Sequence, residues 1–336
     1  MFLTFCAAVH AELPLVTWQG PTMGSIYTVK IVGVEMSAAR VEALTMEIDL
    51  CLSNVNNQIS HYQPDSELSR FNRAPARQPF PVSAGFQRVL RHSFNLNRRS
   101  DGAFDPTLGP LINLWGFGEK TEVRTVPSED QLRAVLARTG CRHLALTERG
   151  ELVKDIPDLT LNLSSPAKGY GVDEMARVLL AHGLTNHYVA ISGDIFTSGH
   201  NAKGQPWQVG ISAPISDWRP GDPLVTVLAL SNRAVSTSGD YQKYLMDDQG
   251  RRLGHIFNPK TGWPVQHNLG GVTVVAADCI SSSSLATTAF VLGPEAGLRF
   301  IESWTNASAL FVVIEPDGKP RSIASSRFTA MSGYQP

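Results

Sequence analysis

The stretch that most constrains this chain runs from Leu161 to Asp173 and reads LNLSSPAKGYGVD. A short apolar segment leads into small residues, then a proline, and then the start of a predicted helix. Small residues let a backbone approach a ligand closely, and a helix N-terminus offers free N–H groups and a partial positive charge to anions. The stretch therefore predicts a loop that approaches a phosphate group or a metal ion.

The composition is that of a globular protein. Of the 336 residues, 43% are hydrophobic and 18% are charged, and the formal net charge is -1. A chain of this length can bury one sizeable core or two lobes. Proteins that bind nucleic acid or anionic membranes need a basic excess, so neither is an expected partner. The sequence contains no run of 18 apolar residues, so no membrane-spanning helix is expected.

Residues 1–11 are apolar apart from Thr4 and His10, and Val9-His10-Ala11 resembles a signal-peptidase site. The basic segment that usually opens a signal peptide is missing, and the apolar run is short. We interpret residues 1–11 as the remnant of a signal peptide and expect the protein to be exported. A plain N-terminal strand is the alternative. Residues 12–336 then form one unit.

Helical periodicity dominates the first half of the chain and strand periodicity the second. Helices are predicted after Ser37, over 83–97, over 128–140, after Pro166 and over 284–292. Strands are predicted over 24–34, 188–191, 207–211, 225–230, 272–276 and 310–314. This order predicts an α+β fold, a two-lobed single unit with antiparallel rather than parallel pairing.

Five further polar segments that contain glycine are spread along the chain. Taken singly, each is typical of a turn. They are 21–25 (PTMGS), 102–110 (GAFDPTLGP), 192–195 (SGDI), 236–241 (STSGDY) and 255–262 (HIFNPKTG).

In this order and at this spacing, the segments resemble the ApbE family, the FAD:protein FMN transferases, from Thr22 to Thr287. The resemblance implies an ApbE-like, T-fold-like flavin transferase domain over 12–336. Such enzymes take FAD as substrate, need Mg²⁺, split the pyrophosphate, and join FMN through a phosphoester to a threonine or serine of a target flavoprotein. The resemblance also implies a periplasmic or exported bacterial protein. Its acceptor could be a membrane electron-transfer subunit.

The resemblance assigns FAD contacts to eight residues, several of which have an ordinary structural alternative. Met23 could be a buried turn methionine, Tyr62 a half-buried tyrosine, and Asp105 the cap of the turn before Pro106. The eight residues are Met23, Tyr62, Ala103, Phe104, Asp105, Asn162, Lys168 and Ile256.

Two of the residues are predicted to be catalytic. Lys168 lies near a predicted helix start, where a cation opposes the helix dipole, and a bound pyrophosphate would remove that conflict. His255 is the candidate general base, because a neutral imidazole near pH 7 can accept the proton of an acceptor hydroxyl. Asp240 could orient a partner or simply shape a turn. We expect the other histidines to be surface or structural residues.

The chain departs from the family pattern at two positions. Ser283 stands where the family's metal site has an aspartate, in a segment that ends at Thr287, and Asn162 stands where the family usually has an aspartate. The remaining predicted metal ligands are the Ser165 carbonyl, the Ser283 hydroxyl and the Thr287 hydroxyl. Magnesium prefers oxygen ligands, usually with one or two carboxylates among them.

Three outcomes are compatible with these departures. The enzyme could bind its metal more weakly, it could recruit another carboxylate from Asp194 or Asp278, or it could have kept flavin binding and lost transfer. The alternatives to the transferase are therefore a non-catalytic FAD-binding relative and an FAD pyrophosphatase that releases FMN and AMP.

Overall fold

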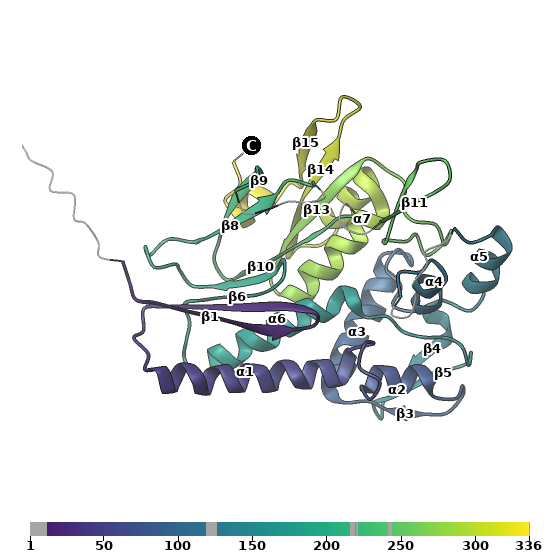
Figure 1. Cartoon of the computed structure of the whole chain (residues 1–336), viewed down its shortest axis with the longest axis horizontal. Helices are drawn as coiled ribbons and strands as arrows, with labels where there is room; N and C mark the ends of the chain where they lie inside the picture. Colours follow the sequence, from purple (N-terminus) through teal and green to yellow (C-terminus); the bar gives the residue numbers. More distant parts are fainter. Residues whose placement is uncertain (1–11, 119–125, 216–218, 220, 241–243, 336) are drawn as a thin grey trace, which may run out of the picture.

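An eight-stranded sheet forms the centre of the protein (Figure 1). The computed structural model describes residues 12–118, 126–215, 219, 221–240 and 244–335. Every neighbouring pair of strands in the sheet is antiparallel, as the sequence predicts. In spatial order the strands are β1 (Leu15–Thr22), β2 (Ser25–Val32), β6 (His187–Ile191), β7 (Asp194–Ser198), β10 (Arg233–Ser238), β13 (Leu269–Ala276), β14 (Ala307–Ile314) and β15 (Pro320–Ala324).

The central strands are covered on both faces. All eight residues of β13 are buried. Val272 and Val274 pack against α7 (Cys279–Glu302), whereas Val275 points to the other face. There it meets the hairpin of β8 (Trp207–Ser212) and β9 (Leu224–Leu230) together with α8 (Phe328–Ser332). A strand buried on both faces reads as a continuous apolar run rather than as an alternating one.

The helices of the first half form a second body beside the sheet. The long helix α1 (Ala38–Ile59) packs its Leu44–Ile48–Leu52 stripe on α6 (Ser164–Ala181), which lies between α1 and the sheet (Figure 1). The remaining elements gather toward the right of Figure 1. They are α2 (Glu67–Arg73), α3 (Ala84–Arg99), α4 (Gly109–Leu114), α5 (Glu129–Leu136), the 3₁₀ turn η1 (Cys141–His143), the strands β3 (Phe80–Pro81), β4 (Leu144–Leu146) and β5 (Glu151–Lys154), and the hairpin of β11 (Tyr244–Met246) and β12 (Arg252–Gly254).

The helix starts that the sequence predicts are confirmed at their caps. The hydroxyls of Ser37, Ser83 and Ser128 each accept the backbone N–H three residues later, and Gln131 completes the capping box. Two expectations were wrong. Helix α7 begins at Cys279, five residues before the predicted Ser284, because Asp278 accepts the Ser281 N–H. The STS segment, predicted as part of a turn, ends strand β10 instead.

Helices α6 and α7 cross at very short range. A Cβ atom on Gly169 would lie 2.3 Å from the carbonyl oxygen of Cys279, so only glycine fits there. One turn later, the carboxylate of Asp173 accepts the N–H groups of Cys279 at 2.7 Å and Ile280 at 2.9 Å. A side chain of α6 therefore satisfies backbone donors at the start of α7.

Asp173 should make stability depend on pH. Burial raises its pKa to about 7, although the two backbone N–H bonds oppose the rise. Since the folded-state pKa exceeds the unfolded one, the folded protein binds more protons, and stability falls as pH rises toward 7. We expect the free energy of unfolding to fall between pH 5 and 8 and the fall to be smaller in Asp173→Asn, as measured by urea denaturation.

The matched control for this prediction is Asp317→Asn. Hydrogen bonds from Lys319 hold the pKa of the exposed Asp317 carboxyl below its usual value, so it titrates below this pH range. The control should keep the wild-type slope. Identical slopes in Asp173→Asn and wild type would contradict the assignment.

Candidate functional site

Hydroxyl and carbonyl oxygens gather where α6, α7 and β10 meet. The Ser283 hydroxyl donates to the Ser165 carbonyl oxygen at 2.7 Å, and the Ser165 hydroxyl donates to Thr287 Oγ1 at 2.9 Å. Ser238 Oγ lies 3.1 Å from Thr287 Oγ1. The structure thus brings together the three predicted metal-ligating residues, although they come from two helices more than 100 positions apart. We call Ser165, Asp194, Ser238, Ser283 and Thr287 the oxygen cluster.

Asp194 adds a carboxylate to the oxygen cluster. It begins β7 after a tight turn in which Ser192 has φ of 54°, and its Oδ2 lies 3.3 Å from Ser283 Oγ. Burial raises the pKa of this carboxyl, while a hydrogen bond with Ser236 and the charge of Lys168 act in the opposite direction. Of the two substitute carboxylates considered from the sequence, Asp194 is at the site. Asp278 is occupied as the cap of α7.

Lys168 lies on α6, deeper in the helix than the sequence predicts. Helix α6 begins at Ser164, so Lys168 is its fifth residue rather than part of the first turn. The helix dipole acts mainly within the first turn, so the predicted conflict with the dipole is weak. A different observation supports an electrostatic role for Lys168. Its side chain is half-buried, and its charge lowers the pKa of Asp194.

A cavity of about 440 Å³ is lined in part by the loop that leads into α6. Its wall includes Asn162 together with Thr160, Gly109, Asn72 and His61. Asn162 precedes Ser165 by three residues, a span of roughly 10 Å at most. An elongated ligand can therefore contact the cavity and the oxygen cluster at once.

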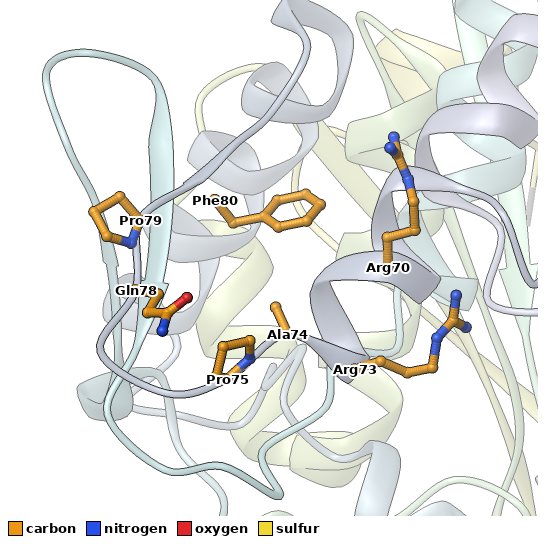
Figure 2. Close-up of a pocket in the computed structure, with 7 residues that line it drawn as sticks. All are labelled: Arg70, Arg73, Ala74, Pro75, Gln78, Pro79 and Phe80. Carbon is orange, nitrogen blue, oxygen red and sulfur yellow. The ribbon is translucent and has the colours of Figure 1, made fainter.

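The cavity wall is held by reciprocal hydrogen bonds. The Asn72 side chain accepts the N–H of Leu161 at 2.8 Å and donates to its carbonyl at 3.0 Å. The Asn162 side chain accepts the Ser164 N–H at 3.0 Å. These bonds fix the loop that enters α6. A second hollow of about 340 Å³ lies across α2, between Arg70, Arg73 and Phe80 (Figure 2), and Arg73 borders both cavities.

Tyr62 and Met23 differ in their surroundings. Tyr62 is 66% exposed, and its ring lies 4.0 Å from the ring of His61, a residue of the cavity wall. Its side chain is therefore available to a ligand at the rim. Met23 occupies the turn between β1 and β2 with φ of 48°, and its methyl group packs beside Gly171 of α6. Met23 is half-buried rather than buried, and its contact with FAD remains a prediction.

The residues of segment 103–105 make packing and turn contacts within the protein. Ala103 and Phe104 are buried, and Phe104 shares an apolar cluster with Ile256. Asp105 accepts both the backbone N–H and the hydroxyl of Thr107, at 2.8 and 2.6 Å. This is the turn cap that was the alternative for Asp105. FAD contacts by these residues remain predictions.

His255 follows β12 and is half-buried. Its ring centre lies 6.4 Å from that of Phe117. The preceding Gly254 touches Asp240, since a Cβ atom on Gly254 would lie 2.6 Å from Asp240 Cβ. Asp240 comes two residues after Ser238 of the oxygen cluster, so this contact links the His255 segment to the cluster. Asp240 also pairs with Arg252 at 2.9 Å.

The other predicted structural histidines in the described chain have ordinary partners. His182 pairs with Glu47 at 2.7 Å, the buried His187 contacts the Leu184 carbonyl, and His200 contacts the Asn201 carbonyl. His10, like the rest of 1–11, lies outside the described residues.

The donor atoms of the oxygen cluster fit a hard cation. Within the described residues, no three His, Cys, Asp or Glu side chains come together as a metal site. The cluster instead offers hydroxyls, one carbonyl and the Asp194 carboxylate. Mg²⁺ takes such oxygens and commonly completes its shell with water and substrate phosphates. The residues therefore fit magnesium bound together with a phosphate ligand.

Comparison with known proteins identifies the family. The ApbE family matches residues 23–311. The chain belongs to the ApbE family. A relative from Vibrio cholerae named FAD:protein FMN transferase is 39% identical over 92% of this chain and 90% of its own length. One of the same name from Haemophilus influenzae is 36% identical over 97% of this chain and 94% of its own length.

Solved ApbE structures share the whole architecture. The flavin transferase ApbE of Vibrio cholerae superposes with a TM-score of 0.84 at 38% identity, covering 95% of this chain and 99% of that one. The apo flavinyl transferase ApbE of Pseudomonas stutzeri gives 0.86 at 36% identity, covering 97% and 99%. These matches confirm the family and the fold that the sequence segments imply.

Sequence reasoning missed three residues that the structure places at the site. Ser238 joins the oxygen cluster, while His61 and Asn72 line the cavity. Ser238 belongs to the STSGDY segment and His61 precedes Tyr62, so both were adjacent to a recognised signal. Asn72 lies in a helix that was not predicted, and only its pairing with the distant Leu161 shows its role.

Gly169→Ala should destabilise the protein at the crossing of α6 and α7. The added methyl group would meet the backbone of Cys279 and Ile280 at 2.3 to 2.9 Å, so α6 and α7 must separate. We expect a loss of stability of about 1–3 kcal/mol by urea denaturation. Gly193→Ala is the control, because its Cβ would meet nothing within 4 Å. Equal stability of the two variants would contradict the tight crossing.

Proposed function

We propose that this protein is an FAD:protein FMN transferase that joins the FMN half of FAD to a threonine or serine hydroxyl of a target flavoprotein. The observation that carries the proposal is the segment 162–165: Asn162 lines a cavity, and Ser165, three residues later, belongs to the oxygen cluster near Lys168. An FAD molecule needs both features, a pocket for its ring systems and a charged, oxygen-rich site for its pyrophosphate. The names of the relatives support the same reaction.

The residues have distinct roles in the proposed transfer. The acceptor hydroxyl oxygen forms a bond to the phosphorus on the FMN side, the bond between that phosphorus and the bridging oxygen breaks, and AMP leaves. His255 takes the proton of the acceptor hydroxyl. Lys168 offsets the negative charge of the pyrophosphate. Asn162, Tyr62 and the cavity wall hold the nucleotide in place.

A divalent cation belongs to the same proposal. The oxygen cluster, with Ser165, Ser283 and Thr287, would hold Mg²⁺, which when bound would offset further charge on the phosphates. The Ser165 carbonyl and the neighbouring hydroxyls supply the hard oxygens that it prefers.

The location and the partner are also proposals. The apolar character of residues 1–11 supports export to the periplasm, and recovery of the protein only in the cytoplasmic fraction of cells would overturn it. No helix in the described part of the chain is long and apolar enough to cross a membrane. The acceptor is then a flavoprotein, such as a membrane electron-transfer subunit, whose acceptor hydroxyl is accessible from the periplasm.

The direct test of the function is covalent flavinylation. Purified protein with FAD, Mg²⁺ and a flavoprotein acceptor should give a fluorescent FMN–protein band on a denaturing gel. Release of AMP with no acceptor present would indicate a pyrophosphatase instead. Binding of FAD with neither product would indicate a non-catalytic relative.

His255→Ala should lose the transfer of FMN to the acceptor but keep its affinity for FAD. Without the base, the rate of flavinylation is expected to fall by at least about 100-fold, while the dissociation constant for FAD, measured by fluorescence quenching, changes little. His182→Ala is the control, because His182 pairs with Glu47 on the exposed face of α1. Wild-type transfer by His255→Ala would remove His255 from the reaction.

Lys168→Ala should weaken the binding of FAD more than the binding of riboflavin. If Lys168 faces the pyrophosphate, the dissociation constant for FAD rises by about tenfold or more, whereas that for riboflavin, which has no phosphate, stays unchanged. The exposed Lys203 provides a control with the same loss of charge, since its partner is Glu12. Equal weakening of both ligands would show that Lys168 acts on the ring system or on folding.

A further inference from the structure

Among the five residues of the oxygen cluster, Asp194 alone carries a carboxylate, and its position is unusual. The Ser283 hydroxyl has two acceptors in reach, the Ser165 carbonyl oxygen at 2.7 Å and Asp194 Oδ2 at 3.3 Å. A serine hydroxyl carries a single hydrogen, and the shorter contact takes it. The contact from the Ser283 hydroxyl to the carboxylate of Asp194, at 3.3 Å, is therefore the longer and weaker of the two. A cation between these oxygens would stabilise the arrangement.

The surroundings of Asp194 in the described chain offer it hydroxyl groups and a lysine at longer range rather than a paired cation. Burial raises the pKa of its carboxyl, and the hydroxyls of Ser236 and Ser283 and the charge of Lys168 act in the opposite direction. Within the part of the chain that the structure describes, however, Lys168 and Asp194 are not within ion-pair distance. Removing an ionised carboxylate from water without a partner is costly, unless a cation coordinates it.

The neighbouring carboxylates are already occupied. Asp278 accepts the Ser281 N–H at 3.0 Å, and both oxygens of Asp173 accept N–H groups from the first turn of α7. Ser283 lies four residues further along α7 than Cys279, roughly 6 Å along the helix axis. Among these three carboxylates, Asp194 is the one with an oxygen within 3.3 Å of the Ser283 hydroxyl, so it is placed to share a metal with Ser283.

We propose that Asp194 is the charged ligand of the divalent cation in this protein, together with the Ser165 carbonyl and the hydroxyls of Ser283 and Thr287. The carboxylate thus comes from strand β7, across from the helix position where the family resemblance implies an aspartate. The proposal rests on the proposed function, because that function supplies the reason for a divalent cation at a pyrophosphate. It goes beyond that function in naming a ligand.

The test measures metal binding rather than turnover. Mn²⁺ replaces Mg²⁺, and the free Mn²⁺ signal in electron paramagnetic resonance is titrated with protein and FAD, with no acceptor present. Asp194→Asn keeps the shape and removes the charge, and it should raise the dissociation constant for Mn²⁺ by at least about tenfold. In that background, Ser283→Asp places a carboxylate on the opposite side of the site and should bring the dissociation constant back toward the wild-type value.

Asp278→Asn is the matched control. It removes the same charge close to the site, and asparagine caps helices as well as aspartate does, so the affinity for Mn²⁺ should stay at the wild-type value. A comparable loss in Asp278→Asn would show that only long-range charge matters, which would overturn the proposal. Unchanged affinity in Asp194→Asn, or no Mn²⁺ binding by the wild type with FAD, would also overturn it.

Two further measurements keep the outcomes separate. If Asp194→Asn does not fold, as judged by circular dichroism, the ligand assignment is tested with Ser283→Asp in the wild-type background. A second carboxylate beside Asp194 should tighten Mn²⁺ binding, and unchanged affinity would overturn the proposal. Flavinylation is assayed independently. If Asp194→Asn binds Mn²⁺ more weakly but the wild type transfers no FMN, the proposed function is refuted and the ligand assignment stands. If the wild type transfers FMN but Asp194→Asn binds Mn²⁺ as tightly as the wild type, only the ligand assignment is refuted.

Discussion

The close crossing of α6 and α7 is the constraint on which the site depends. Gly169 lets the two backbones approach within a distance that any side chain would prevent, and Asp173 fixes the register by accepting the first N–H groups of α7. Because of this crossing, the Ser165 carbonyl of one helix lies 2.7 Å from the Ser283 hydroxyl of the other. The sheet supports the crossing from one side and α1 packs on α6 from the other.

Much of the fold was predictable, since its signals are local. Serine caps mark the starts of α1, α3 and α5, because a short side chain there satisfies backbone N–H groups of the first turn. Runs of β-branched and apolar residues mark strands such as β13 and β14. The antiparallel order followed from the lack of a regular alternation of strands and helices. Family and fold also followed from the order of the glycine-bearing segments, which the comparisons confirm.

Other parts of the site depend on contacts between distant residues and have no local signal. Asp194 and Ser283 are 89 positions apart, and their contact depends on the place of β7 beside α7. Asn72 and Leu161 are also 89 positions apart in the sequence. Asn72 lies in a short helix whose polar sequence shows no clear periodicity. Lys168 shows the reverse case. The sequence marked the right residue, but the true start of α6 weakens the dipole argument, and its proximity to Asp194 replaces it.

The oxygen cluster illustrates how a neutral residue can stand at a position where charge is expected. A serine on α7 provides one hydrogen, which the Ser165 carbonyl takes, so its oxygen faces outward as a ligand or an acceptor. The negative charge can then come from any element whose side chain reaches that oxygen, and in this fold β7 begins at that point. A metal site is defined by the atoms that meet in space rather than by the segment that supplies them. The loss of one aspartate from a sequence pattern therefore does not by itself remove the charge from the site.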